Sequence, residues 1–176
     1  MPYRTKTYIA GDWTGDKDLI DKLHEWNNNE NLNLHFSDVH KYIQARDTSL
    51  YCTIKNSLAN RLNMSKTFIF IVGKNTDNLR KGGCQYCDHY FKYENLNVCL
   101  KRYHTDMRSY IEYEYQKAIK DGLRIIVLYN YSTIYKEKCP EMLKGIGVHI
   151  AAYYKAKNGN YYWNYKAIRD AIDNVT

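Results

Sequence analysis

The chain has 176 residues, of which 44% are hydrophobic and 26% charged, and its net charge is +7 at neutral pH. This composition excludes a wholly disordered chain, and the length is typical of one folded domain, here expected over residues 1–176. No apolar run approaches the roughly 20 residues that a membrane span needs, and the first residues lack the apolar stretch of a secretion signal. We therefore expect a cytoplasmic protein with no membrane partner.

The positive charge permits an anionic partner but does not choose one. Lys and Arg are dispersed, with Lys136–Lys138 as the strongest cluster, which favours a solvated basic surface and speaks against nucleic acid as the partner. The five cysteines are an odd number in a chain without a secretion signal. They are therefore expected to be reduced thiols and not a disulfide framework.

The first third of the chain alternates strand and helix patterns. Lys6–Gly11 is predicted to be a strand, and Leu19, Leu23 and Trp26 then recur at helical spacing. Leu32–Phe36 alternates apolar and polar residues, which predicts a half-exposed strand. A second helix follows Ser49, and its apolar residues recur every three or four positions: Leu50, Ile54, Leu58 and Leu62.

The rest of the chain continues this alternation around a long polar stretch. Thr67–Val72 is apolar on both faces, as in a buried parallel strand, whereas residues 74–106 have no clear period and contain an insert at about 82–106. A third helix is predicted over Met107–Asp121, ending at Gly122, before a buried strand at Arg124–Tyr129. Asn158-Gly159 between aromatic pairs predicts a hairpin, and a final helix carries an apolar face of Tyr165, Ile168, Ile172 and Val175.

This order of elements predicts an α/β fold with a central, mostly parallel sheet flanked by helices. Ligands of such sheets bind outside the carboxyl ends of the strands. The candidate substrate-binding residues at those ends are Ala10, Gly11, Asp12, Trp13, Asp38 and His40. Trp13 is suited to stack on a base or a nicotinamide ring, or merely to cover the sheet edge, and His40 is a ligand contact or a loop histidine without a role.

Three cysteines of the insert raise the question of a metal. Cys84 and Cys87 form a C-x-x-C hook, and Cys99 with His89 or His104 lies nearby in the sequence. Thiolates and imidazoles are the ligands that zinc prefers, and a metal would replace the core that this polar segment lacks. The irregular spacing of the other ligands leaves free thiols as the alternative to a structural zinc.

Glu114 is the most informative carboxylate. At about 100° per residue, Ile111, Glu114, Tyr115 and Ala118 share one face of the third helix, which must pack on the sheet. A carboxylate brought toward a core is unfavourable unless it has a partner or meets a polar cleft. Geometry alone leaves two readings open: a Glu paired with a nearby donor, and a functional Glu.

Four segments of the chain follow one another in a characteristic order. They are Thr7–Ala10, Phe36–Asp38, Phe68–Thr76, and Tyr113–Ile119 leading into Ile125–Asn130. In this order and spacing, roughly residues 5–130 resemble the TIR-like domains of bacterial Thoeris anti-phage systems, the ThsB type. The Cys-bearing insert departs from that pattern.

The resemblance implies a flavodoxin-like TIR fold and NAD⁺ as the substrate, with cleavage of the bond between nicotinamide and ribose. The family's catalytic glutamate corresponds to Glu114, the residue that helical geometry singles out. The implied product is an ADP-ribose-derived signalling nucleotide, either a cyclic ADP-ribose isomer or an ADP-ribose conjugate, which acts on a partner effector protein. Assembly into a homo-oligomer often completes the pocket in this class.

Three other functions fit parts of the sequence. A non-enzymatic TIR-like adaptor or nucleotide-binding module shares the fold and needs no carboxylate in a cleft. A nucleic-acid-binding protein fits the net charge and the 19 tyrosines. A ribosyl hydrolase or nucleoside 2-deoxyribosyltransferase-like enzyme uses similar carboxylate chemistry on another nucleotide.

Overall fold

The computed structural model describes residues 4–32, 34–41, 51–76, 90–93, 96–99 and 106–173. Four parallel strands form its central sheet in the order β1-β2-β5-β6. Their bounds are Lys6–Ala10 for β1, Ser65–Val72 for β2, Arg124–Tyr129 for β5 and Val148–Ala151 for β6. A parallel bridge between Thr7 and Asp38 adds a rudimentary strand beside β1. Counted along the chain, the segment at Asp38 comes second but lies at the border of the sheet, outside β1. This strand order is that of a flavodoxin-like fold.

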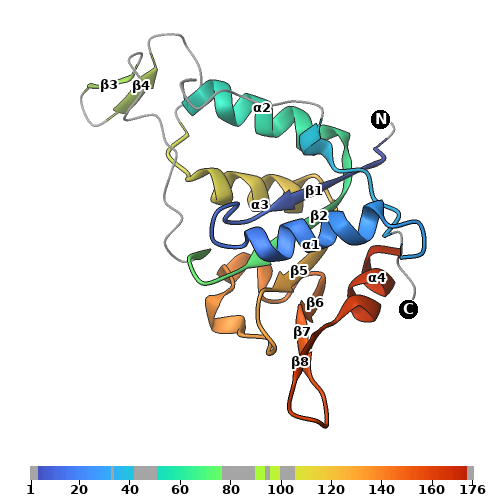
Figure 1. Cartoon of the computed structure of the whole chain (residues 1–176). Coiled ribbons are helices and arrows are strands. Elements are labelled where there is room, and N and C mark those ends of the chain that lie inside the picture. Colours follow the sequence, from blue (N-terminus) through green and yellow to red (C-terminus); the bar gives the residue numbers. More distant parts are fainter. Residues whose placement is uncertain are drawn as a thin grey trace.

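Helices cover both faces of this sheet (Figure 1). One face carries α1 (Lys17–Asn28) and α4 (Tyr165–Asp173), and the other carries α2 (Tyr51–Met64) and α3 (Tyr110–Lys120). Alternate strand residues feed the two cores: Ile9, Ile69 and Ile126 pack under α1 and α4, and their neighbours pack under α2 and α3. Burial on both faces explains why β2 and β5 read as continuous apolar runs.

The remaining elements lie at the rim of this body. Short 3-10 turns are η1 (Val39–Lys41), η3 (Lys136–Lys138) and η4 (Glu141–Leu143). Two antiparallel hairpins are formed by β3 (Tyr90–Tyr93) with β4 (Leu96–Cys99), and by β7 (Tyr153–Lys155) with β8 (Tyr161–Trp163). The β7–β8 hairpin projects away from the sheet in Figure 1. It turns at Gly159, whose φ of 84° suits glycine.

The α/β prediction is confirmed, and most predicted elements lie within a few residues of their expected bounds. Ser109 caps α3 by accepting a hydrogen bond from the backbone N–H of Glu112 (3.2 Å), so the helix begins three residues later than predicted. Gly122, with a φ of 66°, follows the end of α3 as expected. Strand β6 was not predicted, and the stretch 74–106, which has no clear period, contains β3 and β4.

The predicted strand at Leu32–Phe36 is wrong for the part of it that the structure describes. Leu34 and Phe36 are buried, as their alternation suggests, but they form no ladder. The side-chain amide of Asn27 takes the place of a neighbouring strand. It donates a hydrogen bond to the carbonyl of Phe36 (2.9 Å) and accepts one from the backbone N–H of Phe36 (3.0 Å). His35 has a positive φ of 51°, which is incompatible with a regular strand.

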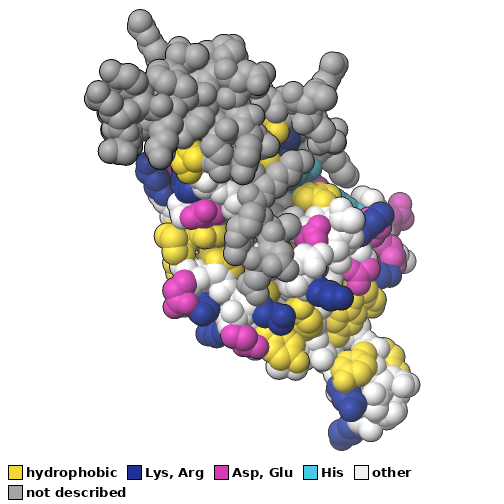
Figure 2. All heavy atoms as spheres, turned by 90° about the vertical axis from the view of Figure 1, so that its left-hand side faces the viewer, with side chains coloured by type: hydrophobic (Ala, Val, Ile, Leu, Met, Phe, Trp, Pro, Cys, Tyr) yellow, Lys and Arg dark blue, Asp and Glu magenta, His cyan; other side chains and the backbone are white. Residues whose placement is uncertain are grey.

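Charged side chains of both signs are interspersed on the face shown in Figure 2, where Lys and Arg lie among Asp, Glu and apolar groups. None of the helices in the described ranges combines the length and the apolarity needed to cross a bilayer.

We predict that Gly147→Ala lowers the free energy of unfolding by about 1–3 kcal/mol. Gly147 has a φ of 78° immediately before β6, and a Cβ there would lie 2.3 Å from the carbonyl oxygen of Ile125. Urea denaturation of the two proteins measures the difference. Gly145→Ala is the matched control, since a Cβ at Gly145 meets nothing within 4 Å. Equal losses in both variants would contradict the assignment of a close approach at Gly147.

Candidate active site

The turn after β1 lies against the turn after β2 at the carboxyl end of the sheet. Asp12 accepts hydrogen bonds from the backbone N–H of Thr14 (3.0 Å) and from the side-chain amide of Asn75 (2.8 Å). The bond from Asn75 contributes most to lowering the pKa of Asp12. Ala10 is buried at the end of β1, and a Cβ at Gly11 would come within 3.0 Å of Ile71. Asp12 and Asn75 therefore make the rim of this edge polar.

Asp16 lies at the same edge of the sheet, between α1 and the residue that follows β5. It is buried at the start of α1, where Asn130, directly after β5, donates to its Oδ1 (3.0 Å). Burial raises the pKa of Asp16, in contrast to the lowered pKa of Asp12. A Cβ at Gly73 would lie 1.9 Å from Asp16 Oδ1, so the residue after β2 must be glycine for this packing.

Asp38 and His40 form a second polar group beside β1. The Oδ1 of Asp38 lies 2.8 Å from His40 Nδ1, and its Oδ2 lies 3.3 Å from Nε2 of His24 on α1. Burial opposes the charge of Asp38, but hydrogen bonds from both histidines outweigh it and lower the pKa of this carboxyl. Asp38 thus fixes the position of the His40 ring.

Two aromatic rings flank His40, one at the surface and one in the core. The His40 ring contacts Trp13 edge-on at a centroid distance of 4.9 Å and contacts Tyr8 at 4.7 Å. Trp13 is 44% exposed, whereas Tyr8 in the middle of β1 is fully buried. The ring of Trp13 is therefore available to a planar ligand on its open side.

Glu114 lies in the second turn of α3, on the face that packs against β1. Its Oε1 accepts a hydrogen bond of 2.6 Å from the hydroxyl of Tyr8. Desolvation raises the pKa of Glu114 to about 7, while the Tyr8 bond and the positive charge of Arg61 on α2 act in the opposite direction. The residue is half-buried, and part of it remains accessible. The helical period thus placed Glu114 correctly at the edge of the core.

The predicted residues Trp13, Asp38 and His40 are therefore brought into one connected group with Glu114, and Tyr8 is the connection. Asp12 belongs to the neighbouring rim, which bonds to Asn75. Sequence reasoning missed Tyr8 and Arg61. Both residues carry a signal in the sequence. Tyr8 has a hydroxyl at the tip of a side chain in a buried strand, and this hydroxyl needs a hydrogen-bond partner. Arg61 is a charged residue directly before Leu62, one of the apolar residues that recur along α2.

The predicted metal ligands lie in the part of the chain between β2 and α3. Cys84, Cys87, His89 and His104 lie outside the described residues, and Cys99 belongs to β4 without a described side chain. Within the described ranges, no group of three or more His, Cys, Asp or Glu is arranged to hold a metal ion. The structural zinc stays a prediction.

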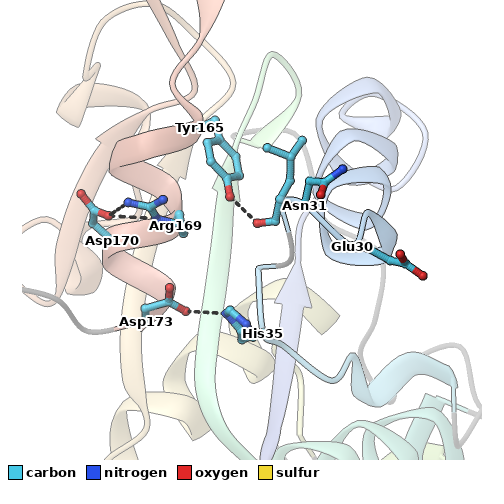
Figure 3. A pocket seen from close by; sticks show the side chains of 8 residues that line it. Glu30, Asn31, His35, Tyr165, Arg169, Asp170 and Asp173 are labelled. Carbon is cyan, nitrogen blue, oxygen red and sulfur yellow. Dashed lines mark hydrogen bonds and ion pairs between the residues drawn. The ribbon is translucent and has the colours of Figure 1, made fainter.

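A groove of about 400 Å³ lies on the other side of the sheet, between α4 and the loop after α1 (Figure 3). Two pairs of titratable groups lie along it: Arg169 bonds to Asp170 (2.9 Å), and His35 lies 3.6 Å from Asp173. The hydroxyl of Tyr165 donates to the carbonyl of Leu32 and closes one wall. The groove belongs to the layer of α1 and α4, and Glu114 belongs to the layer of α2 and α3, so the two are separate features.

Comparison with known proteins places part of this architecture in a family. No curated protein matches the chain. Residues 8–81 match the family model described as the TIR-like domain of the Thoeris protein ThsB. The matched segment begins within β1 and contains α1, α2 and β2. It includes Tyr8, Trp13, His40 and Arg61, whereas Glu114 follows it in the chain. Over residues 8–81, the chain is therefore similar to the TIR-like domain of the Thoeris protein ThsB.

Proposed function

We propose that this protein is an NAD⁺-consuming enzyme of anti-phage defence that cleaves the nicotinamide–ribose bond, with Glu114 as the catalytic residue. The observation that carries the proposal is the placement of Glu114: a half-buried carboxylate with a pKa raised to about 7, on the helix that faces β1. Perturbed carboxyl groups of this kind concentrate at active sites. The Thoeris TIR-like match supports the same reading.

The chemistry needs only one charged group beside the sugar. Nicotinamide is a cationic leaving group in NAD⁺ and departs as a neutral base, so its departure requires no general acid. The transition state places positive charge on the ribose, and an ionised Glu114 facing the ribose would stabilise that charge. The low-polarity surroundings that raise the pKa of Glu114 also strengthen its attraction to a cation.

The residues at the strand ends supply the remaining contacts in this proposal. The exposed ring of Trp13 stacks on a planar base, and His40, fixed by Asp38, supports it. Ala10 and Gly11 border the proposed substrate site at the end of β1, and the carboxylate of Asp12, beside Asn75, is the proposed acceptor for substrate hydroxyl groups.

The attacking nucleophile determines the product. Water gives ADP-ribose, an atom of the same molecule gives a cyclic ADP-ribose isomer, and a second small molecule gives an ADP-ribose conjugate. We propose that one of the latter two products is a diffusible signal for a partner effector, and that neighbouring copies of the chain complete the pocket.

A non-enzymatic adaptor or nucleotide-binding module is the second candidate. One observation favours it: Glu114 already has a hydrogen-bond donor in Tyr8 and a neighbouring positive charge in Arg61, which is how a carboxylate with a structural role is stabilised. The two candidates differ in whether Glu114 is required for turnover.

We predict that Glu114→Gln reduces nicotinamide release from NAD⁺ by at least about 100-fold, because the amide cannot offset positive charge on the ribose. The protein is incubated with NAD⁺, with and without lysate of phage-infected cells, and the products are identified by mass spectrometry. The expected wild-type products are nicotinamide and one new ADP-ribosyl species.

Glu112→Gln is the matched control for this experiment. Glu112 is half-buried on the same helix, but its side chain accepts from Gln116 (3.1 Å) and does not contact Tyr8. Activity near the wild-type level is expected for this variant. Equal turnover by wild type and Glu114→Gln would reject the catalytic role of Glu114, and release of a base from another nucleotide with NAD⁺ left intact would favour a different ribosyl-transfer enzyme.

The rate of nicotinamide release should rise with pH and reach half its maximum near pH 7. Protonation removes the charge of Glu114, and the pKa of that carboxyl is about 7, so the active form is lost as the pH falls through this value. Initial rates between about pH 5.5 and pH 8.5 measure this limb. A rate that is constant or falls with rising pH over this range would contradict the requirement for an ionised Glu114.

Glu114→Gln is expected to be more stable than the wild type at alkaline pH. A carboxyl whose pKa is raised by folding, from 4.5 to about 7, favours the folded state when protonated and opposes it when ionised. The gain in the free energy of unfolding should reach up to about 3 kcal/mol above pH 7 and shrink to zero below about pH 4.5. Denaturation curves across this range test it, and a gain that is independent of pH would contradict the burial of an ionisable Glu114.

A further inference from the structure

We propose that Tyr8 is the positioning residue of Glu114: its hydroxyl, donated from β1, orients the carboxylate and stabilises its charged form. The proposal rests on the proposed function of Glu114. Tyr8 is not one of the residues predicted from the sequence, and 106 positions separate it from its partner.

The geometry directs the proton of this hydroxyl to Glu114, while Arg61 hydrogen-bonds to the same hydroxyl group. The Tyr8 side chain is fully buried, so water does not compete for its hydroxyl, and the 2.6 Å distance to Glu114 Oε1 is that of a short, charge-assisted bond. The ring itself is held on two sides: Phe68 stacks on it at a centroid distance of 5.7 Å, and His40 contacts it edge-on at 4.7 Å. A ring that is clamped in this way fixes the direction of its O–H group.

The bond also determines which oxygen of Glu114 is used. Oε1 accepts from Tyr8, which leaves Oε2 as the oxygen for a ribose. A donor on one oxygen stabilises the ionised carboxylate and prevents its rotation, and preorganisation of this kind is the main source of electrostatic catalysis. A Phe at position 8 would fill the same space and supply neither effect.

One further charge faces the pair from a different element. Arg61 of α2 is almost fully buried. Burial raises the pKa of both Glu114 and Tyr8, and the positive charge of Arg61 opposes that rise at both groups, with a hydrogen bond to Tyr8 in addition. Its Nε has no hydrogen-bond partner within the described part of the chain. His40 of η1 lies against the ring of Tyr8, and its Nδ1 is engaged by Asp38 (2.8 Å). Among the described residues, Glu114 therefore receives a hydrogen bond from β1 and a positive field from α2.

Direct titration of Glu114 tests the proposal without relying on turnover. The side-chain carboxyl carbons of Glu are labelled with ¹³C in the intact chain, and the Glu114 signal is identified by its loss in Glu114→Gln. In Tyr8→Phe, the midpoint of the Glu114 titration should move upward by about one pH unit, because the ionised form loses its donor. The acid limb of nicotinamide release should move by the same amount, which a purely structural role of Tyr8 would not produce.

Tyr129→Phe is the matched control. Tyr129 is equally buried in the same core, and its hydroxyl bonds to Nδ1 of His149 (2.9 Å) without touching Glu114. The Glu114 midpoint should stay at its wild-type value there, although stability falls. Replacement of Tyr8 by 3-fluorotyrosine keeps the ring and makes the hydroxyl a stronger donor, so the midpoint should move downward. This second variant keeps the test open if Tyr8→Phe fails to fold.

The outcomes separate this proposal from the function on which it rests. An unchanged Glu114 midpoint in Tyr8→Phe, or an equal shift in Tyr129→Phe, would overturn the positioning role of Tyr8 whether or not the protein cleaves NAD⁺. A shifted midpoint with no nicotinamide release from the wild type would uphold the Tyr8–Glu114 coupling and reject the enzymatic function.

Discussion

A single hydrogen bond between β1 and α3 holds an acidic side chain where the packing would otherwise exclude it. α3 must press its apolar residues, Ile111, Tyr115 and Ala118, onto the sheet, and Glu114 lies on that same face. The hydroxyl of Tyr8 meets the carboxylate there, so the helix packs with Glu114 half-buried and its charge partly compensated. The raised pKa of Glu114 is the remaining sign of this conflict between burial and charge. Ionisation of a carboxyl group whose pKa is raised by folding opposes the folded state, so the position of Glu114 lowers the stability of the protein above about pH 7.

The periodicity of the chain was sufficient to predict the layers. The apolar runs at Thr67–Val72 and Arg124–Tyr129 became β2 and β5, and the stripe of Ile54, Leu58 and Leu62 faces the sheet from α2. The face assigned to Glu114 was also correct, because eleven residues of α3 follow a regular helical period. Local patterns of this kind depend on neighbours in the sequence, and those are visible without a structure.

The features that sequence reasoning missed depend on contacts between distant residues. The partnership of Tyr8 with Glu114 spans 106 positions, and nothing in the local pattern of either segment indicates the other. The failed strand at Leu32–Phe36 has the same origin, since the competing hydrogen bonds come from Asn27, nine residues earlier. Strand β6 is short, half-exposed and preceded by a glycine turn, so it lacks the apolar run that identified its neighbours.

The amide of Asn27 has a further effect at the margin of the sheet. A strand at the border of a sheet offers unpaired N–H and C=O groups that invite another polypeptide to add to it, which is a route to aggregation. Beside β1, the N–H and the C=O of Phe36 both bond to the side chain of Asn27, and within the described residues the bridge at Asp38 is what continues the sheet outward. These two intramolecular hydrogen bonds therefore blunt the border, and they discourage growth of the sheet by a foreign strand.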